Sequence, residues 1–307
     1  MTGRAAGGRG GSAIRIGLSG WSYAPWRGHF YPKGVTQRQE LAYAATRFPA
    51  LEVNGTFYRL QRPETFRHWA QETPNGFVFA VKASRFITHT KRLRDTEEAL
   101  AKFFASGVLE LGPKLGPLLW QLPPSLRFDS GLMAEFLARL PKDTRSAVHL
   151  AGRHGADREG VELARANPDR PLRHAVEVRH DSFRDPAFAR LLREHDVALV
   201  CADTPRWPRL MDLTADFAYC RLHGAVELYR SRYTGAALAR WAKRMSAWAN
   251  GQRMTDGEFI IPPATRTFPR EVFVFFDNTD KLHAPDDAMR LMRMAGVEWK
   301  VAEKGAA

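Results

Sequence analysis

The feature that most constrains the fold is a series of eight short apolar segments, most of which end in polar or charged residues. Stretches with helical periodicity separate most of these segments, whose length and composition suit β-strands. Strands that alternate with helices pair in parallel through right-handed crossovers. The sequence therefore predicts an α/β fold, a single (β/α)8 barrel of the TIM type. Its strands are expected at residues 14–19, 51–54, 77–82, 115–122, around Glu177, and at 197–203, 217–223 and 271–276.

A doubly wound open sheet would also explain this alternation. Such sheets often carry a GxGxxG turn after the first strand, and the chain has none there, so we favour the barrel. Before the fifth strand we expect an enlarged polar connection, residues 141–172, with a short helix near 158–166 and with His149 and His154 in structural or interfacial roles. Helices are expected at residues 36–48, 64–72, 96–108, 130–140, 186–195, 236–250 and 285–295.

The length of 307 residues suits one large domain, which we place at residues 14–300 between flexible tails at 1–13 and 301–307. Only two cysteines occur, Cys201 and Cys220, and both lie within apolar segments, which is typical of a reducing compartment. No apolar segment is long enough for a membrane span or placed as a signal peptide would be. These features predict a cytoplasmic protein without a membrane partner.

The chain is strongly basic, with 46 Lys and Arg residues against 33 Asp and Glu residues and a formal net charge of +13. Such a balance favours anionic partners. We expect an anionic small-molecule ligand, with nucleic acid as the alternative, although a basic surface without any dedicated site would show the same composition. The sequence predicts no oligomeric state.

The segment around Glu177 reads RHAVEVRHDSF and carries charges that an ordinary core strand would lack. In an extended chain, Val176 and Val178 share one face while Glu177 and Arg179 share the other. Burying an unpaired charge costs several kcal/mol, so these two side chains must meet partners or line a wet cavity.

The same alternation, applied to every strand, brings polar residues to one end of the barrel. In TIM barrels the catalytic groups gather at the C-terminal mouth, where the strands end. The alternative is that these charges pair with one another and plug the mouth. The predicted ring contains Ser19, Glu52, Asn54, Lys82, Gln121, Glu177, Arg179, Asp203, Tyr219, Arg221, His223, Asp277 and Asn278.

Four of these residues are candidates for catalysis. Glu177, Asp203 and His223 could exchange protons, and histidine suits this role because it titrates near neutrality, although a buried histidine is equally often structural. Lys82 and the arginines could hold a phosphate or carboxylate, and a Schiff base on Lys82 is a further alternative. The candidates for substrate binding are Ser19, Trp21, Tyr23, Glu52, Asn54, Tyr58, Gln121, Arg179, Arg221, Asp277 and Asn278.

A divalent metal is the one cofactor that the ring could hold. Carboxylates and imidazole suit Mg²⁺, Mn²⁺ or Zn²⁺, but no compact spacing such as HxxxH supports a site. We therefore predict an ion only if Arg179 and Arg221 point away from the mouth. The candidate ligands are Glu52, Glu177, Asp203, His223 and Asp277.

Two loops on the same face are unusual in composition. Residues 20–32 are rich in aromatic side chains, which could stack on a ligand or cap the core. Residues 82–94 are basic and could contact phosphate, or form a solvated surface. A nucleic-acid-binding phosphodiesterase would show a positive track into the mouth made by Arg27, Lys33, Arg85, Lys91 and Arg94.

Six ordered motifs resemble the YecE-like domain-of-unknown-function family seventy-two, from about residue 14 to residue 296. They are GLSGWSYAPWRGHFYP, LEVNGTFYRL, FVFAVKASRFITH, HAVEVRHDSF, YCRLHG and VFVFFDN. The resemblance implies a single (β/α)8 barrel and no particular reaction. Asp277, where the family more often has Asn, and the 141–172 connection depart from the pattern. The family's motif positions fall on Gly20, Trp21, Tyr23, Glu52, Asn54, Tyr58, Lys82, Glu177, Arg179, Arg221, His223, Gly224 and Asn278.

Three functions follow from this reading. The first is an enzyme that uses acid/base residues at the C-terminal mouth on a phosphorylated or otherwise anionic small molecule. The second is a nucleic-acid-binding protein or a metal-assisted phosphodiesterase. The third is a non-catalytic ligand-binding barrel whose charged ring is fully self-paired.

Overall fold

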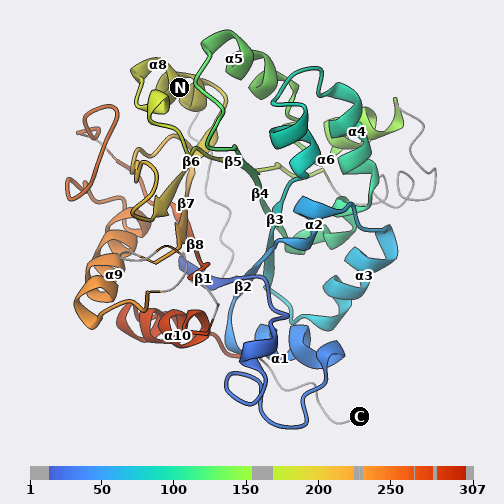
Figure 1. Cartoon of the computed structure of the whole chain (residues 1–307), viewed down its shortest axis with the longest axis vertical. Helices are drawn as coiled ribbons and strands as arrows, with labels where there is room; N and C mark the ends of the chain where they lie inside the picture. Colours follow the sequence, from blue (N-terminus) through green and yellow to red (C-terminus); the bar gives the residue numbers. More distant parts are fainter. Residues whose placement is uncertain are drawn as a thin grey trace.

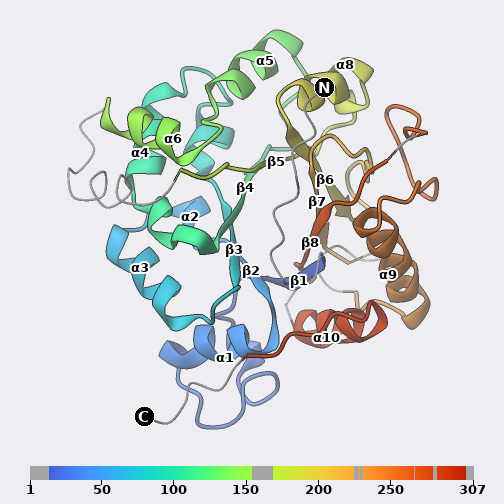
Figure 2. The same ribbon diagram turned by 180° about the vertical axis from the view of Figure 1, so that it is seen from behind.

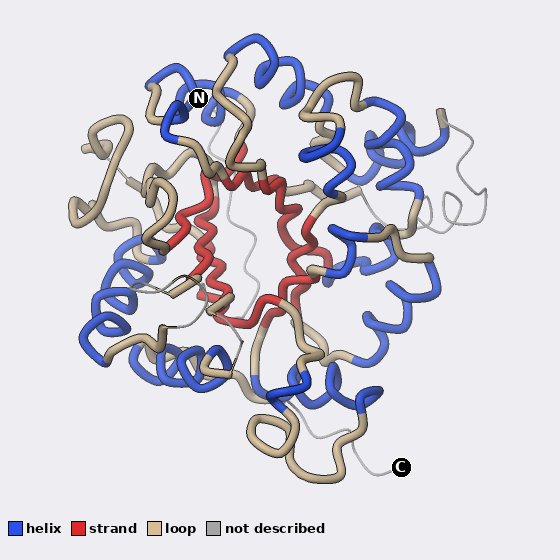
Figure 3. The backbone as a smooth tube through the Cα atoms, in the orientation of Figure 1, coloured by secondary structure: helices blue, strands red, loops and turns tan. Residues whose placement is uncertain are grey.

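A computed structural model of the chain describes residues 14–153, 169–224, 228, 231–265, 267–278 and 282–301. Eight parallel strands follow one another around a closed barrel, and β1 pairs with β8 to close it (Figures 1 and 3). The prediction of a (β/α)8 barrel is confirmed, and the open sheet is wrong. The strands are β1 (Ile14–Ser19), β2 (Ala50–Val53), β3 (Val78–Lys82), β4 (Leu115–Gln121), β5 (His174–Glu177), β6 (Val197–Asp203), β7 (Phe217–Leu222) and β8 (Glu271–Phe276).

Helices surround the barrel on its outside, as the view from behind also shows (Figure 2). No helix formed by the described residues is long and apolar enough to cross a membrane. The α-helices are α1 (Glu40–Arg47), α2 (Gly55–Tyr58), α3 (Pro63–Glu72), α4 (Glu97–Ala105), α5 (Ser130–Arg139), α6 (Thr144–Gly152), α8 (Pro186–Glu194), α9 (Gly235–Ala249) and α10 (Ala284–Met294). Shorter helical turns lie at Ala24–Trp26, Gln37–Gln39, Phe86–Thr90, Val108–Lys114 and Asp181–Phe183.

Helix α6 lies within the predicted polar connection and was not expected. Asp143 caps its first turn by accepting a hydrogen bond from the amide of Ser146, whose hydroxyl contacts Asp143 in return. His149 is an exposed residue of this helix. The predicted helix near 158–166 and His154 lie outside the described residues, so the enlargement of the connection stays a prediction.

The strands separate two apolar layers. In β2, Leu51 and Val53 pack toward the helices, whereas Ala50 and Glu52 face the lumen. Small side chains and a few aromatic rings fill the lumen, as in a packed barrel core. The lumen's apolar residues are Ala50, Val78, Ala80, Leu119, Ala175, Ala198, Val200, Ala215, Phe217, Tyr219, Phe273 and Phe275.

An ion-pair cluster occupies the N-terminal end of the barrel. Glu271 accepts hydrogen bonds from Arg15 Nε at 2.6 Å and from Arg173 Nη1 at 2.5 Å. The Arg173 guanidinium also lies over the rings of Phe217 and Phe273. This end is therefore held together by its own charges.

Candidate active site

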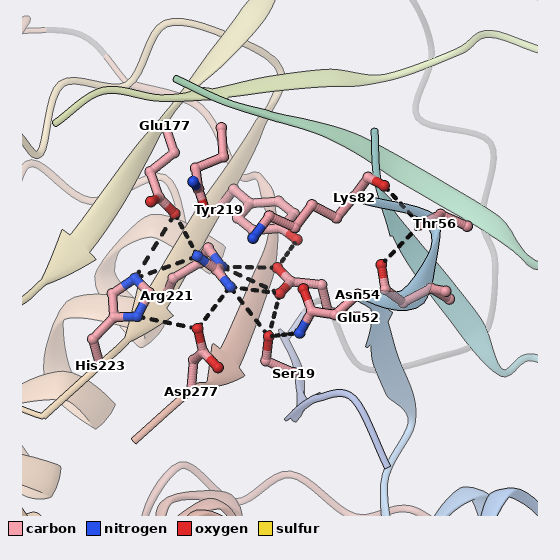
Figure 4. A network of polar contacts seen from close by, with 12 residues as sticks. Ser19, Glu52, Asn54, Thr56, Lys82, Glu177, Tyr219, Arg221, His223 and Asp277 are labelled. Atoms are coloured by element: carbon pink, nitrogen blue, oxygen red, sulfur yellow. Dashed lines mark hydrogen bonds and ion pairs between the residues drawn. The ribbon is translucent and has the colours of Figure 1, made fainter. Parts of the chain in front are cut away.

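Arg221 of β7 is the centre of a polar network at the C-terminal mouth (Figure 4). Its guanidinium is fully buried and contacts three carboxylates, two from β2 and β5 and one from the residue that follows β8. The distances are 2.8 Å from Nη2 to Glu52 Oε1, 2.6 Å from Nη1 to Glu177 Oε2 and 2.9 Å from Nη2 to Asp277 Oδ2. The planar fork of arginine donors suits such multiple carboxylate contacts.

Glu52 is surrounded by hydroxyl donors. The Ser19 hydroxyl donates to Glu52 Oε1 and accepts from Asn54 Nδ2 at 2.7 Å. Tyr219 Oη donates to Glu52 Oε2 at 2.6 Å. Burial and then the charge of Glu52 raise the pKa of Tyr219 well above its usual value, so the phenol keeps its proton and stays a donor.

Glu177 is held between two arginines. Its Oε1 accepts from Arg179 Nε at 2.7 Å, while its Oε2 faces Arg221. Burial raises the pKa of this carboxyl, but the charges of Arg179 and Arg221 outweigh burial and keep the pKa well below its usual value. Arg179 also donates to Gln121 Oε1 at 2.9 Å and stacks over the ring of Trp207 at 4.1 Å. Glu177 is thus a fixed anion that orients its neighbours.

His223 follows β7 and lies between two carboxylates of the network. Its Nδ1 is 3.2 Å from Asp277 Oδ2, and its Nε2 is 3.8 Å from Glu177 Oε2. The ring is fully buried and meets the edge of Trp207 at 5.4 Å between centroids. Two carboxylates therefore fix the orientation of the imidazole.

Lys82, the last residue of β3, differs from the other cations of the mouth. Its side chain extends toward the Arg221 group (Figure 4) and is 7% exposed, with Nζ 4.1 Å from the centre of the Phe57 ring. Burial, and secondly the charge of Arg221, lowers the pKa of Lys82 to about 8. No carboxylate of the described residues forms an ion pair with this ammonium group.

Two residues near Lys82 and Arg179 were not predicted as site residues. His89 lies on the π-helical turn Phe86–Thr90, an irregularity frequent at functional sites, and meets the Phe57 ring edge-on at 5.1 Å. Burial, followed by the charges of Lys82 and Arg179, lowers the pKa of His89 to about 4, so its imidazole is neutral. Trp207 comes from an irregular loop, where hydrophobic periodicity gives no signal. For His89, the basic composition of residues 82–94 is the feature of the sequence that points to this region.

Asp203 lies outside the predicted ring, because its side chain faces the helix layer. Its Oδ2 accepts from Trp241 Nε1 at 3.0 Å and its Oδ1 from Arg209 Nη1 at 3.2 Å. In β6 the small Ala198 points into the lumen, and the bulkier Leu199 points outward. Asp203 shares the phase of Leu199, so it cannot reach Arg221.

Four other predicted substrate-binding residues also lie outside the ring. Asn278 donates to Asp287 Oδ2 at 3.0 Å, because Asp277 takes the inward phase after β8. Trp21 packs on Trp69 and Phe79 in the outer layer.

Tyr23 donates to the carbonyl of Ser19 at 2.9 Å and packs against Trp26. The aromatic loop therefore caps the outer core instead of forming a wall at the mouth. Tyr58 is 72% exposed and packs on Phe57. The residues that the structure does bring together are Ser19, Glu52, Asn54, Lys82, Gln121, Glu177, Arg179, Tyr219, Arg221, His223 and Asp277.

The condition for a divalent metal is not met. Arg221 and Arg179 both point into the mouth, and the Arg221 guanidinium sits among the carboxylates that would have been ligands. Across the described ranges, no group of three or more His, Cys, Asp or Glu side chains is arranged to hold an ion. The carboxylates Glu52, Glu177 and Asp277 are thus already paired with the guanidinium of Arg221.

Comparisons with known proteins agree with this architecture. Residues 15–306 match the profile of a family described as "Protein of unknown function DUF72". The chain is 24% identical over 273 residues to UPF0759 protein YecE of Escherichia coli (strain K12), which covers 87% of this chain and 93% of that protein. UPF0759 protein YunF of Bacillus subtilis (strain 168) is 30% identical over 116 residues, 36% of this chain and 40% of that protein.

Solved structures of two bacterial proteins share the fold. A DUF72 family protein from Thermotoga maritima superposes with a TM-score of 0.66 at 24% identity, over 92% of this chain and 99% of that one. A DUF72 family protein from Enterococcus faecalis gives a TM-score of 0.65 at 19% identity, over 96% and 100% of the two chains. At sequence identities of 24% and 19%, these structures show only that the fold is shared.

Proposed function

The chain belongs to the DUF72 family, whose description names no reaction, and from the geometry of the mouth we propose an enzyme that acts by acid/base chemistry on a small anionic molecule. The observation that carries the proposal is Lys82. A buried ammonium group without a carboxylate partner is costly, and an incoming anion would supply that partner.

Other places for an anion at this end of the barrel are less suitable. TIM barrels often bind phosphate near the last two strands, at the N-terminus of a helix. Here the first turn of α10 carries Asp286 and Asp287, and acids repel an anion at that position. Asp287 already accepts hydrogen bonds from Asn278 and from the amide of Tyr233. These contacts favour the Lys82 side of the mouth.

His223 is the proposed proton-transfer group. Its two flanking carboxylates, Asp277 and Glu177, hold the ring between them, and a positioned histidine is the commonest proton-transfer group in enzymes. Asp277 and Arg179 keep some exposure on the rim, so they are the groups that a bound substrate would meet beside Lys82. The roles of Ser19, Glu52 and Tyr219 are then to orient Arg221.

The test is anion binding followed by thermal unfolding. An anion that binds only the folded chain, at about ten times its Kd, should raise Tm by about 3 °C. A panel of phosphate, sugar phosphates and carboxylic acids should contain at least one such ligand. Lys82→Met should abolish the shift, and Lys91→Met, in the segment that follows β3, should keep it. An equal shift in the Lys82→Met protein would contradict the proposal.

Nucleic-acid binding has less support from the described contacts. Arg27, the first residue of the predicted basic track, is paired with Glu40 at 2.8 Å. Arg85 and Arg94 are exposed but have no role in the network. Binding of an oligonucleotide that weakens steeply with salt and survives Lys82→Met would favour this alternative.

A further inference from the structure

We propose that the Lys82 amine is a nucleophile that forms a Schiff base with the carbonyl carbon of a 2-oxo acid. This inference rests on the proposed function, because the carboxylate of the 2-oxo acid is the anion that the mouth attracts. It adds the identity of the reacting atom and the class of substrate.

The surroundings of Lys82 increase the share of its neutral amine form compared with an ordinary lysine. Its nitrogen lies over the face of Phe57 at 4.1 Å and is largely removed from water. No described carboxylate pairs with it, whereas Arg221 and Arg179 are each engaged with at least one. A lysine that is held in an ion pair stays protonated, and this one is not so held.

The pKa of about 8 supports the same conclusion. At pH 7, about a tenth of such lysines carry a neutral amine, compared with about 0.04% of ordinary lysines. Desolvation in an apolar surrounding is one established way to activate a lysine for attack on a carbonyl group.

A 2-oxo acid suits this site because its carboxylate and carbonyl groups are adjacent. The ammonium form of Lys82 attracts the carboxylate, which brings the carbonyl carbon next to the nitrogen. A simple ketone lacks the anion, and a phosphate monoester without a carbonyl group cannot react. The product is an iminium cation beside a carboxylate, so the charge of the mouth is unchanged.

The atoms and charges of the step balance. The lysine ammonium loses one proton to solvent water, and the amine attacks the carbonyl carbon to give a carbinolamine. The carbon–oxygen bond then breaks, and the oxygen leaves as water after it has taken one proton from solvent and a second proton from the nitrogen. Ammonium and ketone thus become iminium and water, with no oxidant or reductant.

The iminium group would withdraw electrons from the neighbouring carbon. Carbon–hydrogen bonds on that carbon become easier to break, because the iminium nitrogen can accept the electron pair. The reaction class is therefore proton exchange or carbon–carbon bond formation next to the former carbonyl.

Reductive trapping tests the proposal directly. The full chain is incubated at pH 7 with pyruvate and sodium cyanoborohydride, which reduces an iminium to a stable secondary amine, and the modified peptides are quantified by mass spectrometry. We expect the Lys82 adduct to form at least tenfold faster than the Lys91 adduct. Its rate should rise with pH and level off above pH 8, while that of Lys91 continues to rise. Propionaldehyde, which lacks the anion, should show a smaller preference for Lys82 than pyruvate does.

Two variants separate this inference from the proposed function. Lys82→Arg keeps a cation but has no primary amine, and Lys82→Met has neither. Without reductant, pyruvate should stabilise the wild type and Lys82→Arg but not Lys82→Met. Equal trapping of Lys82 and Lys91, with that stabilisation intact, would overturn the Schiff base and leave the proposed function standing. If no anion in the panel stabilised the wild type, the proposed function itself would fail.

Discussion

At the scale of single residues, Arg221 holds three segments of the barrel together. Glu52, Glu177 and Asp277 come from positions far apart in the sequence, and each contacts the same guanidinium. The four charges are buried or nearly so. Removing one member of such a cluster leaves uncompensated buried charges and is strongly destabilising.

Arg221→Met should therefore destabilise the fold strongly. We expect a loss of about 3–5 kcal/mol in the free energy of unfolding, because three carboxylates lose their shared cation. Urea unfolding at pH 7 measures this loss. Arg221→Lys is the matched control, since it keeps the positive charge but not the planar set of guanidinium donors. Its loss in the free energy of unfolding should be smaller. A loss below about 1 kcal/mol for Arg221→Met would mean that the network does not bind the strands together.

Lys82→Met should have the opposite effect on stability. The pKa of Lys82 is about 8 in the folded chain and about 10.4 when unfolded, so the unfolded state binds more protons between these values. Below pH 8 the charged lysine lowers stability, and this cost disappears as the pH rises toward 10.4.

We expect Lys82→Met to raise the free energy of unfolding by about 1–3 kcal/mol at pH 7 and by much less at pH 10. Urea unfolding of the wild type and the variant at pH 7 and at pH 10 measures the two changes in the free energy of unfolding. Such a gain would be typical of a functional group that is retained at the expense of stability. Destabilisation at both pH values would show that Lys82 has a partner in the folded chain.

At the scale of elements, the phase of each strand decides which side chains meet. In β2 and β3 one face is clearly more polar than the other, so the alternation correctly placed Glu52 and Lys82 in the lumen. In β6, VALVCAD, both faces are apolar, and only the smaller size of Ala198 and Ala202 marks the lumen side. A closed lumen leaves room mainly for small side chains. The face of β6 with the smaller residues is therefore expected to point inward, which places Asp203 on the outer face.

Elements without a periodic core face were harder to predict. The polar composition of residues 141–172 predicts a loop and hides helix α6. Its capping residues Asp143 and Ser146 are nevertheless visible in the sequence. Trp207 and His89 belong to irregular loops, whose conformation depends on tertiary contacts. The barrel and the charged ring were therefore predictable from strand patterns, and the aromatic surroundings of Lys82 and Arg179 were not.

Asp203→Asn distinguishes a structural carboxylate of the helix layer from one of the mouth. Asp203 bonds Trp241 of α9 and Arg209, so we expect a loss of about 1–3 kcal/mol in stability when its charge is removed. Because it does not face Lys82, anion-dependent stabilisation should be unchanged. Thermal unfolding with and without the anion checks both points, and Glu177→Gln, inside the mouth, is the comparison. Loss of anion binding in Asp203→Asn would place this residue in the site after all.

At the scale of the whole molecule, the two ends of the barrel are built alike. Glu271 lies between Arg15 and Arg173 at the N-terminal end, as Glu177 lies between Arg179 and Arg221 at the mouth. For Glu271 burial raises the pKa, but Arg173 and then Arg15 outweigh it and lower the pKa overall. Each end thus contributes stability only while its glutamate is ionised. The difference is that the mouth also contains Lys82, a cation without such a carboxylate among the described residues.

This symmetry predicts how acid unfolds the barrel. A carboxyl group whose pKa is lowered by folding stabilises the chain fully above its unfolded pKa, about 4.3 for glutamate, and loses that contribution as the pH falls below it. Glu271→Gln should therefore cost roughly 1–3 kcal/mol at pH 7 and progressively less below pH 4.3. Urea unfolding between pH 3 and pH 7 gives the stability curves of the wild type and the variant, which should converge in acid.

Because Glu271 lies at the end remote from Lys82, anion binding at pH 7 should be the same in this variant as in the wild type. Parallel curves would mean that Glu271 acts through packing, and altered anion binding would mean that the two ends of the barrel are coupled.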